Sequence, residues 1–250
     1  MWIFRTLLYW IALVVFTILF SILAFTVSLV DRQGNGAHQI ARIWAKTLLF
    51  FSGVRIHLQG NIHELARHTP CIFMANHQSA FDIFVLLAGL PVSFRWLAKE
   101  ELFKIPIFGP AMRRAGYISI NRDNPRDAVR SLNEAAKKIQ EGVSVVVFPE
   151  GTRSKDGHLL PFKSGGFVLA IKSQVPIIPT ALIGTFEVKP VGSFWIYPKP
   201  VTIRIGSPIP TSGFKTKEKE ILKRKVFQAL SSLLEPTTLT DQNKREKHDK

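Results

Sequence analysis

The stretch CIFMANHQSAFDIFVLLAGL, residues 71–90, joins a short apolar run to a longer apolar segment through a polar turn. Residues 71–75 have the length of a buried strand, whereas residues 79–90 are long enough for a helix. Ser79 and Asp82 have the spacing of a capping box, which predicts a helix that begins at Ser79. The stretch therefore predicts a strand, a turn and a helix, the repeating unit of α/β folds.

The same alternation of strand-like runs and helical segments continues along residues 53–235. The expected strands cover residues 54–59, 71–75, 94–98, 117–120, 143–148, 177–183 and 201–206, and the expected helices cover 79–90, 125–142, 162–174 and 216–235. This order predicts a single α/β domain whose mostly buried sheet is flanked by helices. Residues 236–250 are polar and highly charged, which predicts a disordered tail.

The segment from Thr6 to Val30 precedes this domain and contains no charged residue. As a helix it would be roughly 37 Å long, against a hydrocarbon core of about 30 Å. A signal peptide would have a shorter apolar region and a small-residue cleavage site. Residues 36–53 predict an amphipathic helix that lies on a bilayer surface or packs on the soluble domain. Residues 1–52 are therefore expected to anchor the protein to a membrane, as a spanning helix or as a hairpin in one leaflet.

The composition suits a folded domain that meets an anionic partner. Hydrophobic residues make up 46% of the 250 residues, which is enough for a sizeable core and excludes global disorder. The net charge of +15 and the isoelectric point near 10.2 favour nucleic acid, anionic lipid or a phosphorylated small molecule as partner. Cys71 is the one cysteine, so no intrachain disulfide can form.

His77 and Asp82 are the candidate catalytic pair. On a continuous helix, five residues correspond to about 500° of rotation, so the pair meets only if His77 precedes the helix. The Asp82 carboxylate would then orient the imidazole and stabilise its protonated form, as a general base requires. The alternative is that Asp82 only caps the helix.

The stretch FPEGTRS, residues 148–154, directly follows an apolar run and is the second candidate for a site. Gly151 would let the backbone approach a ligand, Thr152 offers a hydroxyl group, and Arg153 can bind a phosphate through two hydrogen bonds. The alternative is a polar turn with an exposed salt bridge.

Two further stretches carry weaker signals. The strand-like run GYISI ends near Arg122, another candidate phosphate ligand, although such an arginine commonly meets only water. The two prolines of VPIIP, residues 175–179, favour an edge strand or a strand entry, and a shaped acyl groove is the other interpretation.

Together, NHQSAFD, GYISINR, FPEGTRS and VPIIP resemble, in this order, the four motifs of the 1-acyl-glycerol-3-phosphate acyltransferases. The similarity covers residues 54–210, and its first and third motifs together are specific. It implies an enzyme that moves a fatty acyl group from acyl-CoA or acyl-carrier protein to the sn-2 hydroxyl of lysophosphatidic acid. The product would be phosphatidic acid, for phospholipid synthesis.

The resemblance also implies a role for individual residues. His77 would be the general base and Asp82 its orienting partner, as the residues themselves suggest. The glycerol-phosphate end of the acceptor would be bound by Arg122, Glu150, Gly151, Thr152 and Arg153, with Asn76, Lys104 and Lys163 as supporting residues. No zinc-type spacing such as H-E-x-x-H occurs in the sequence, so neither a metal nor a cofactor is expected.

The expected partners are lysophosphatidic acid, the acyl thioester and the bilayer, with acyl-carrier protein as a further partner if it carries the acyl group, but no nucleic acid. The catalytic domain is expected on the cytoplasmic face of a membrane, because acyl thioesters occur there and basic residues follow the apolar segment. Two alternatives stay open. The acceptor could be another lysophospholipid or an acylated amino-acid lipid, or the chain could be a non-catalytic, membrane-anchored basic binding protein.

Overall fold

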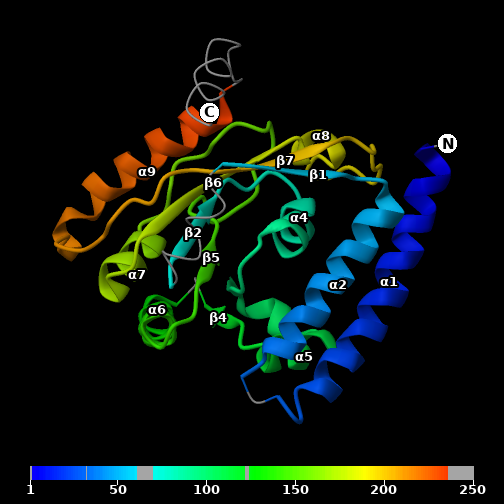
Figure 1. The fold of residues 1–250 in the computed structure, drawn as a ribbon, viewed down its shortest axis with the longest axis horizontal. Coiled ribbons are helices and arrows are strands. Elements are labelled where there is room, and N and C mark those ends of the chain that lie inside the picture. Colours follow the sequence, from blue (N-terminus) through cyan, green and yellow to red (C-terminus); the bar gives the residue numbers. More distant parts are fainter. Residues whose placement is uncertain (1, 32, 61–69, 122–123, 236–250) are drawn as a thin grey trace, which may run out of the picture.

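The structure, a computed structural model, describes residues 2–31, 33–60, 70–121 and 124–235 (Figure 1). Its strands are β1 Ile56–Gln59, β2 Ile72–Ala75, β3 Arg95–Lys99, β4 Ile118–Ile120, β5 Val145–Val147, β6 Ile177–Ile183 and β7 Val201–Ile205. Its α-helices are α1 Trp2–Val27, α2 Asn35–Ser52, α4 Phe81–Gly89, α5 Phe108–Arg114, α6 Pro125–Gln140, α7 Gly165–Ser173, α8 Thr185–Val188 and α9 Lys219–Leu234. The short 3₁₀ helices η2 Glu100–Lys104 and η3 Thr216–Glu218 complete the described elements.

Within the described residues the strands form one seven-stranded sheet in the order β1-β7-β6-β2-β5-β3-β4. The strands from β6 to β4 pair in parallel, whereas β7 is antiparallel to β6. All seven predicted strands and the α/β fold class are confirmed. The edge interpretation of VPIIP is wrong, because β6 lies between β7 and β2. Pairing of β6 with β7 begins at Thr180, so the absent N–H of Pro179 costs no bond on that side.

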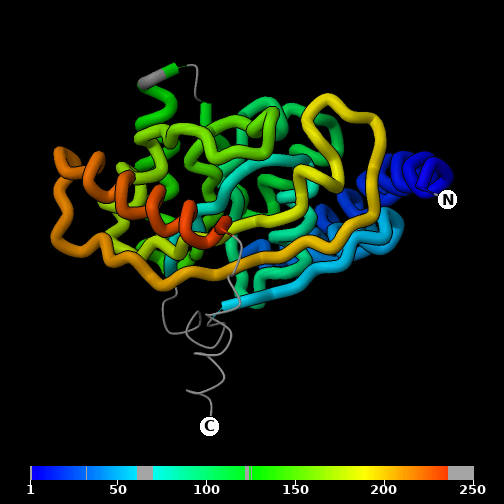
Figure 2. Tube along the Cα trace, turned by 90° about the horizontal axis from the view of Figure 1, so that it is seen from above, coloured from blue at the N-terminus to red at the C-terminus, as the bar shows by residue number. Residues whose placement is uncertain are grey.

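Helices cover both faces of the sheet. In β2, Phe73 and Ala75 enter a core shared with α1, α2, α4 and α5. Ile72 and Met74 point to the opposite face and enter a core shared with α6, α7 and α9. This alternation follows from the two-residue period of a strand, and every β2 side chain is buried. Figures 1 and 2 show α1 and α9 on opposite sides of the molecule.

Helix α1 is attached to the α/β domain rather than held away from it. The Tyr9 ring stacks on Phe81, at the start of α4, with ring centroids 5.3 Å apart. Further along α1, Thr17 accepts a hydrogen bond of 3.2 Å from the indole N–H of Trp44 in α2. The helix thus shares a core with the domain, and the domain boundary expected at residues 52 and 53 stays a prediction.

Helix α2 packs on the domain, which confirms one of the two alternatives for residues 36–53. Arg42 donates hydrogen bonds to the carbonyls of Leu90 (2.6 Å) and Val92 (3.3 Å), just beyond the end of α4. These carbonyls lie where a helix end leaves acceptors without intrahelical partners. Ile43, by contrast, is exposed although its spacing placed it in the apolar stripe. The predicted tail, residues 236–250, lies outside the described residues.

The structure differs from the sequence expectation at two helices near the sheet edge. Helix α4 begins at Phe81 instead of Ser79, because the turn before it is held by side-chain bonds rather than by helical ones. Helix α5 has no predicted counterpart. It begins just after Ile107, whose φ of 65° is rare for a β-branched residue, and such a start has no sequence signal.

Gly109 is expected to be required for the packing of α5. A Cβ atom there would overlap the carbonyl oxygen of Phe103, which also accepts a hydrogen bond of 2.7 Å from Arg113. Gly109→Ala should therefore lower the free energy of unfolding by about 1–3 kcal/mol.

Gly165→Ala is the matched control, because Gly165 also lies at a helix start and has open space around it. It should leave stability unchanged or raise it by up to about 1 kcal/mol. Urea unfolding in detergent measures both variants, and equal losses would show that α5 tolerates the extra methyl group.

Candidate active site

The turn between β2 and α4 carries His77 at the carboxyl end of the sheet. His77 precedes α4 and Asp82 is the second residue of that helix, as the sequence predicted. Their side chains meet, with the imidazole Nδ1 2.7 Å from the carboxylate Oδ2. Asp82 is completely buried, whereas 16% of the His77 side chain is exposed.

The same carboxylate oxygen of Asp82 holds the backbone of the turn. It accepts hydrogen bonds from the backbone N–H groups of Gln78 (2.7 Å) and Ser79 (2.9 Å). An oxygen that accepts two N–H groups is an acceptor for the imidazole too, so Nδ1 of His77 carries the proton and Nε2 is left to accept one. Asp82 therefore both caps the helix start and orients His77, and the two sequence interpretations are compatible.

The other side of His77 is fixed by the segment that follows β5. The imidazole stacks on the Phe148 ring with centroids 4.0 Å apart and an interplanar angle of 12°. The backbone N–H of Ser154 donates to the His77 carbonyl at 2.8 Å. The motifs NHQSAFD and FPEGTRS thus form one structural unit, although His77 and Phe148 are 71 residues apart in the sequence.

Glu150 joins the two motifs through hydrogen bonds of both its carboxylate oxygens. Its Oε1 accepts the backbone N–H of His77 at 2.7 Å, and its Oε2 accepts that of Leu160 at 2.9 Å. The side chain is 1% exposed. Burial raises the pKa of the Glu150 carboxyl group to about 7, against the opposing effect of the two N–H donors. The geometry therefore favours a positioning role over the substrate contact predicted for it.

Asn76, the residue after β2, binds the neighbouring strand β6 in a comparable way. Its amide group donates to the carbonyl of Leu182 (2.9 Å) and accepts from the Leu182 N–H (2.7 Å). This pair of bonds continues the contact between β2 and β6 by one residue beyond the end of β2. The residue directly before His77 is thereby anchored to β6.

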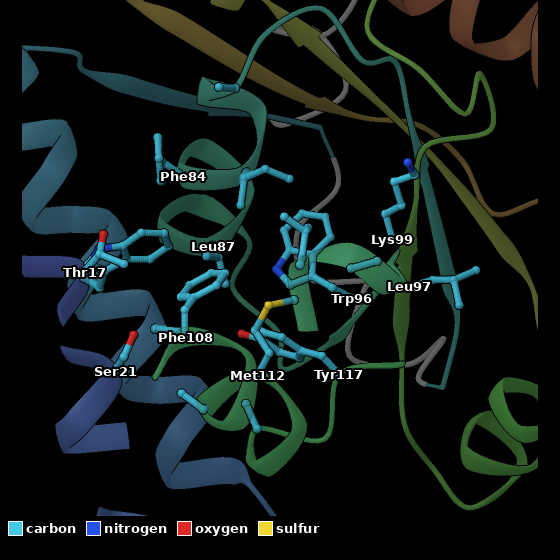
Figure 3. Close-up of a pocket in the computed structure, with 18 of the residues that line it drawn as sticks. Thr17, Ser21, Phe84, Leu87, Trp96, Leu97, Lys99, Phe108, Met112 and Tyr117 are labelled. Atoms are coloured by element: carbon cyan, nitrogen blue, oxygen red, sulfur yellow. The ribbon is translucent and has the colours of Figure 1, made fainter. Parts of the chain in front are cut away.

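A cavity of about 520 Å³ begins at this turn and extends between the sheet and the helices of one face. His77, Gly151, Thr152 and Arg153 line it, together with mostly apolar side chains of α1, α2, α4 and α5. Figure 3 shows this space bordered by Thr17 and Ser21 of α1, Phe84 and Leu87 of α4, Phe108 and Met112 of α5, and Trp96 and Lys99 of β3. Such a volume lies in the range of sites that hold a small organic ligand.

Two cationic side chains line the cavity, and a third lies close to one of them. Arg153 and Lys99 line the cavity, and Lys99 also forms an ion pair of 2.8 Å with Glu101. Burial and the charge of Arg153 lower the pKa of Lys189, so these two cations lie close enough to repel each other. A phosphate group between them would relieve this repulsion.

Two of the remaining predicted residues, Lys104 and Lys163, are not among the described residues that line this cavity. Lys104 is exposed and pairs with Glu100 at 3.2 Å, and the Lys163 side chain is exposed. Arg122 lies outside the described residues, so its role stays a prediction.

Sequence reasoning missed Lys99, Lys189 and Trp96. Lys99 follows the predicted strand 94–98, and so it had the signal that singled out Arg153, a polar residue at the carboxyl end of a strand. Lys189 and Trp96 had no such signal. Their positions depend on contacts with α1 and Phe148, which are distant in sequence.

Chemically, the arrangement suits transfer of a group to a hydroxyl. An imidazole with a fixed tautomer can accept a proton at Nε2, and the buried carboxylate stabilises the imidazolium that forms. Adjacent cations can hold a phosphate, and the apolar cavity can hold a hydrocarbon chain.

Comparison with known proteins gives consistent findings. The Acyltransferase family model matches residues 53–183. The chain is 40% identical over 168 residues to a chloroplastic 1-acyl-sn-glycerol-3-phosphate acyltransferase of Brassica napus, covering 67% of this chain and 48% of that protein. It is 33% identical to the alpha form of the Ovis aries enzyme of the same name, covering 84% of this chain and 73% of the relative.

A solved structure has the same fold. The crystal structure of the 1-acyl-sn-glycerophosphate (LPA) acyltransferase of Thermotoga maritima aligns with a TM-score of 0.78 and 27% identity. The alignment covers 93% of this chain and 94% of that one. The chain spans only about half the length of the Brassica napus relative and of a similar chloroplastic enzyme of Arabidopsis thaliana.

Replacing Glu150 tests its role in joining the two motifs. An amide can accept only one of the two N–H groups, so Glu150→Gln should lower the free energy of unfolding by about 1–3 kcal/mol. Glu141→Gln, at an exposed residue 4.0 Å from Lys137, is the matched control and should change stability little.

The deficit of Glu150→Gln should shrink as pH rises. The folded pKa of about 7 exceeds the ordinary value of 4.5, so ionisation of Glu150 removes stability from the wild type across that window. The glutamine variant lacks this loss. Urea unfolding at several pH values measures the gap, and a gap that widens with pH would mean that the N–H donors outweigh burial.

Proposed function

This chain belongs to the acyltransferase family, and on that premise we propose that it makes phosphatidic acid. It would transfer a fatty acyl group from a thioester, acyl-CoA or acyl-carrier protein, to the sn-2 hydroxyl of 1-acyl-glycerol-3-phosphate. The observation that carries this proposal is the His77–Asp82 pair at the cationic end of an apolar cavity. The names of the relatives support the same acceptor.

The geometry supports a direct transfer. Nε2 of His77 would take the proton of the acceptor hydroxyl as its oxygen bonds to the thioester carbonyl carbon. The carbon–sulfur bond then breaks, and the imidazolium returns the proton to the thiolate. Asp82 holds the imidazole throughout by the 2.7 Å bond to Nδ1. The acceptor hydroxyl is itself the nucleophile, so the reaction needs neither a covalent acyl-enzyme nor a metal.

Arg153 would bind the phosphate of the acceptor, with Gly151 and Thr152 beside it. Lys189 adds positive charge close to Arg153, and Lys99 adds positive charge to the cavity wall. Arg122 is proposed as a further phosphate ligand on the sequence motif alone. The fatty chain would lie among the apolar side chains shown in Figure 3.

We also propose that α1 lies in one leaflet of the membrane, beside a catalytic domain on the cytoplasmic face. By length and composition α1 could cross a bilayer. Yet both of its ends contact the same domain: Trp10 stacks on Phe194 with centroids 5.5 Å apart, and Arg114 lies 5.7 Å from the centre of the Phe25 ring. A helix that crossed the bilayer would carry one end away from the domain.

The free face of α1 supports this orientation. Its exposed side chains form a long apolar surface: Ile3, Phe4, Leu7, Ile11, Val14, Val15, Ile18, Leu19, Ile22 and Leu23. In the first turn of α1, Trp2 contacts the exposed rings of Trp195 and Tyr197, with ring centroids 5.2 Å and 5.4 Å away. Aromatic side chains of this kind favour the headgroup level of a bilayer.

His77→Ala is expected to lower acyl transfer by ~10²–10⁴-fold, because the general base is lost. Asp82→Asn should also impair turnover, and it should lower stability since three donors share the Asp82 carboxylate. The assay uses purified protein, lysophosphatidic acid and acyl-CoA or acyl-carrier-protein donors. His57→Ala, at an exposed histidine of β1, is the control and should retain activity. A folded His77→Ala protein with normal turnover would favour the non-catalytic alternative.

Single cysteines can test the position of α1. Cys71 is completely buried, and burial raises the pKa of its thiol to about 12, so it should not react with a membrane-impermeant maleimide. In sealed vesicles, Trp2→Cys and Val30→Cys should be labelled from the same side as Lys217→Cys, which marks the catalytic domain. Labelling of Trp2→Cys from the opposite side only would mean that α1 spans the bilayer.

A further inference from the structure

Trp96 presents an unpaired hydrogen-bond donor to the cavity. The side chain comes from β3, and the residue is 5% exposed. Its indole nitrogen has no hydrogen-bond partner among the described residues. In Figure 3 this nitrogen faces the interior of the cavity, on the side of Phe108 and Met112.

Two other polar side chains that line the same cavity, Trp44 and Tyr117, are paired within the protein. The indole N–H of Trp44 donates to Thr17 at 3.2 Å, and the Tyr117 hydroxyl lies 3.1 Å from Nδ1 of His38. A buried donor without an acceptor costs free energy. A phenylalanine at position 96 would avoid this cost, because its ring carries no hydrogen-bond donor. The unpaired N–H therefore indicates an acceptor that arrives with a ligand.

The position of Trp96 limits what this acceptor can be. Its ring stacks on Phe148 with centroids 5.7 Å apart, and Phe148 stacks on His77. The indole thus lies one aromatic ring beyond the imidazole, at the start of the apolar part of the cavity. A fatty acyl chain that extends inward from His77 carries one kind of hydrogen-bond acceptor, the carbonyl oxygen at its head.

We propose that the Trp96 indole N–H binds the carbonyl oxygen of the acyl group whose chain occupies the cavity. This inference rests on the proposed function. The carbonyl belongs either to the sn-1 ester of the lysolipid acceptor or to the thioester of the donor. In both cases the hydrogen bond fixes how deeply the chain enters, and so it aligns the reacting group with His77.

Trp96→Phe tests the proposal because it keeps an aromatic ring against Phe148 and removes the N–H. Kinetics are measured with two acceptors, 1-acyl-glycerol-3-phosphate and its 1-O-alkyl analogue, which has an ether in place of the ester carbonyl. If the sn-1 ester is the ligand, KM for the acyl acceptor should rise by about 5- to 100-fold and KM for the alkyl acceptor should not change. If the thioester is the ligand, donor KM should rise or kcat should fall equally with both acceptors.

Trp44→Phe is the matched control, since the Trp44 indole is already paired with Thr17. It should not alter the ratio of the KM values for acyl and alkyl acceptors. Unchanged constants for a folded Trp96→Phe protein with both acceptors and the donor would overturn the inference. A wild-type protein without acyl transfer to either acceptor would instead overturn the proposed function.

A binding measurement on the wild-type protein tests the same contact without relying on the folding of a variant. In protein labelled with ¹⁵N at tryptophan, an indole N–H signal should move downfield when 1-acyl-glycerol-3-phosphate or a non-hydrolysable acyl-CoA with an intact carbonyl is added in detergent. The 1-O-alkyl acceptor should not move that signal. If neither carbonyl-bearing ligand shifts any indole signal, the inference is wrong.

Discussion

A single oxygen atom, Oδ2 of Asp82, accepts hydrogen bonds from the His77 imidazole and from the two backbone N–H groups that follow it. The bonds are possible together because the carboxylate belongs to the first turn of α4 and the donors belong to the turn that precedes it. One carboxylate consequently sets the imidazole tautomer, the course of the chain and the start of the helix. Its complete burial strengthens each bond, since no water competes for the oxygen.

A second carboxylate connects this turn to the rest of the sheet. Glu150 binds the backbone of His77 from the segment after β5, while Asn76 binds β6 on the other side. The turn is thereby held by both strands that neighbour β2. Parallel strands make this possible because their carboxyl ends meet at one edge of the sheet. The position of His77 thus depends on polar groups that need not touch a substrate themselves.

The N-terminal helices connect the site to its surroundings. α1 and α2 complete the cavity wall with Thr17, Ser21 and Trp44, so the helix with the exposed apolar face also borders the space proposed for the fatty chain. A lipid that entered from the leaflet beside α1 would reach the cavity without passing through water. The hydrophobic effect favours such a route for a single-chain lysolipid, since its chain stays in an apolar environment throughout.

The sequence by itself determined the features that depend on local patterns. The short apolar runs predicted all seven strands, and the spacing of His77 and Asp82 allowed the two side chains to meet if the helix began after His77. The tertiary structure alone decided the features that depend on contacts between distant segments. Glu150 turned inward because its carboxylate accepts the backbone N–H of His77, 73 residues away in the sequence. Trp96 is positioned by its contact with Phe148, and Lys189 by its contact with Trp10 of α1. The long apolar segment allowed a spanning helix or a hairpin, and its contacts with Phe194 and Arg114 favour the latter. Periodicity reports which face of an element is apolar, but it does not report which partner covers that face.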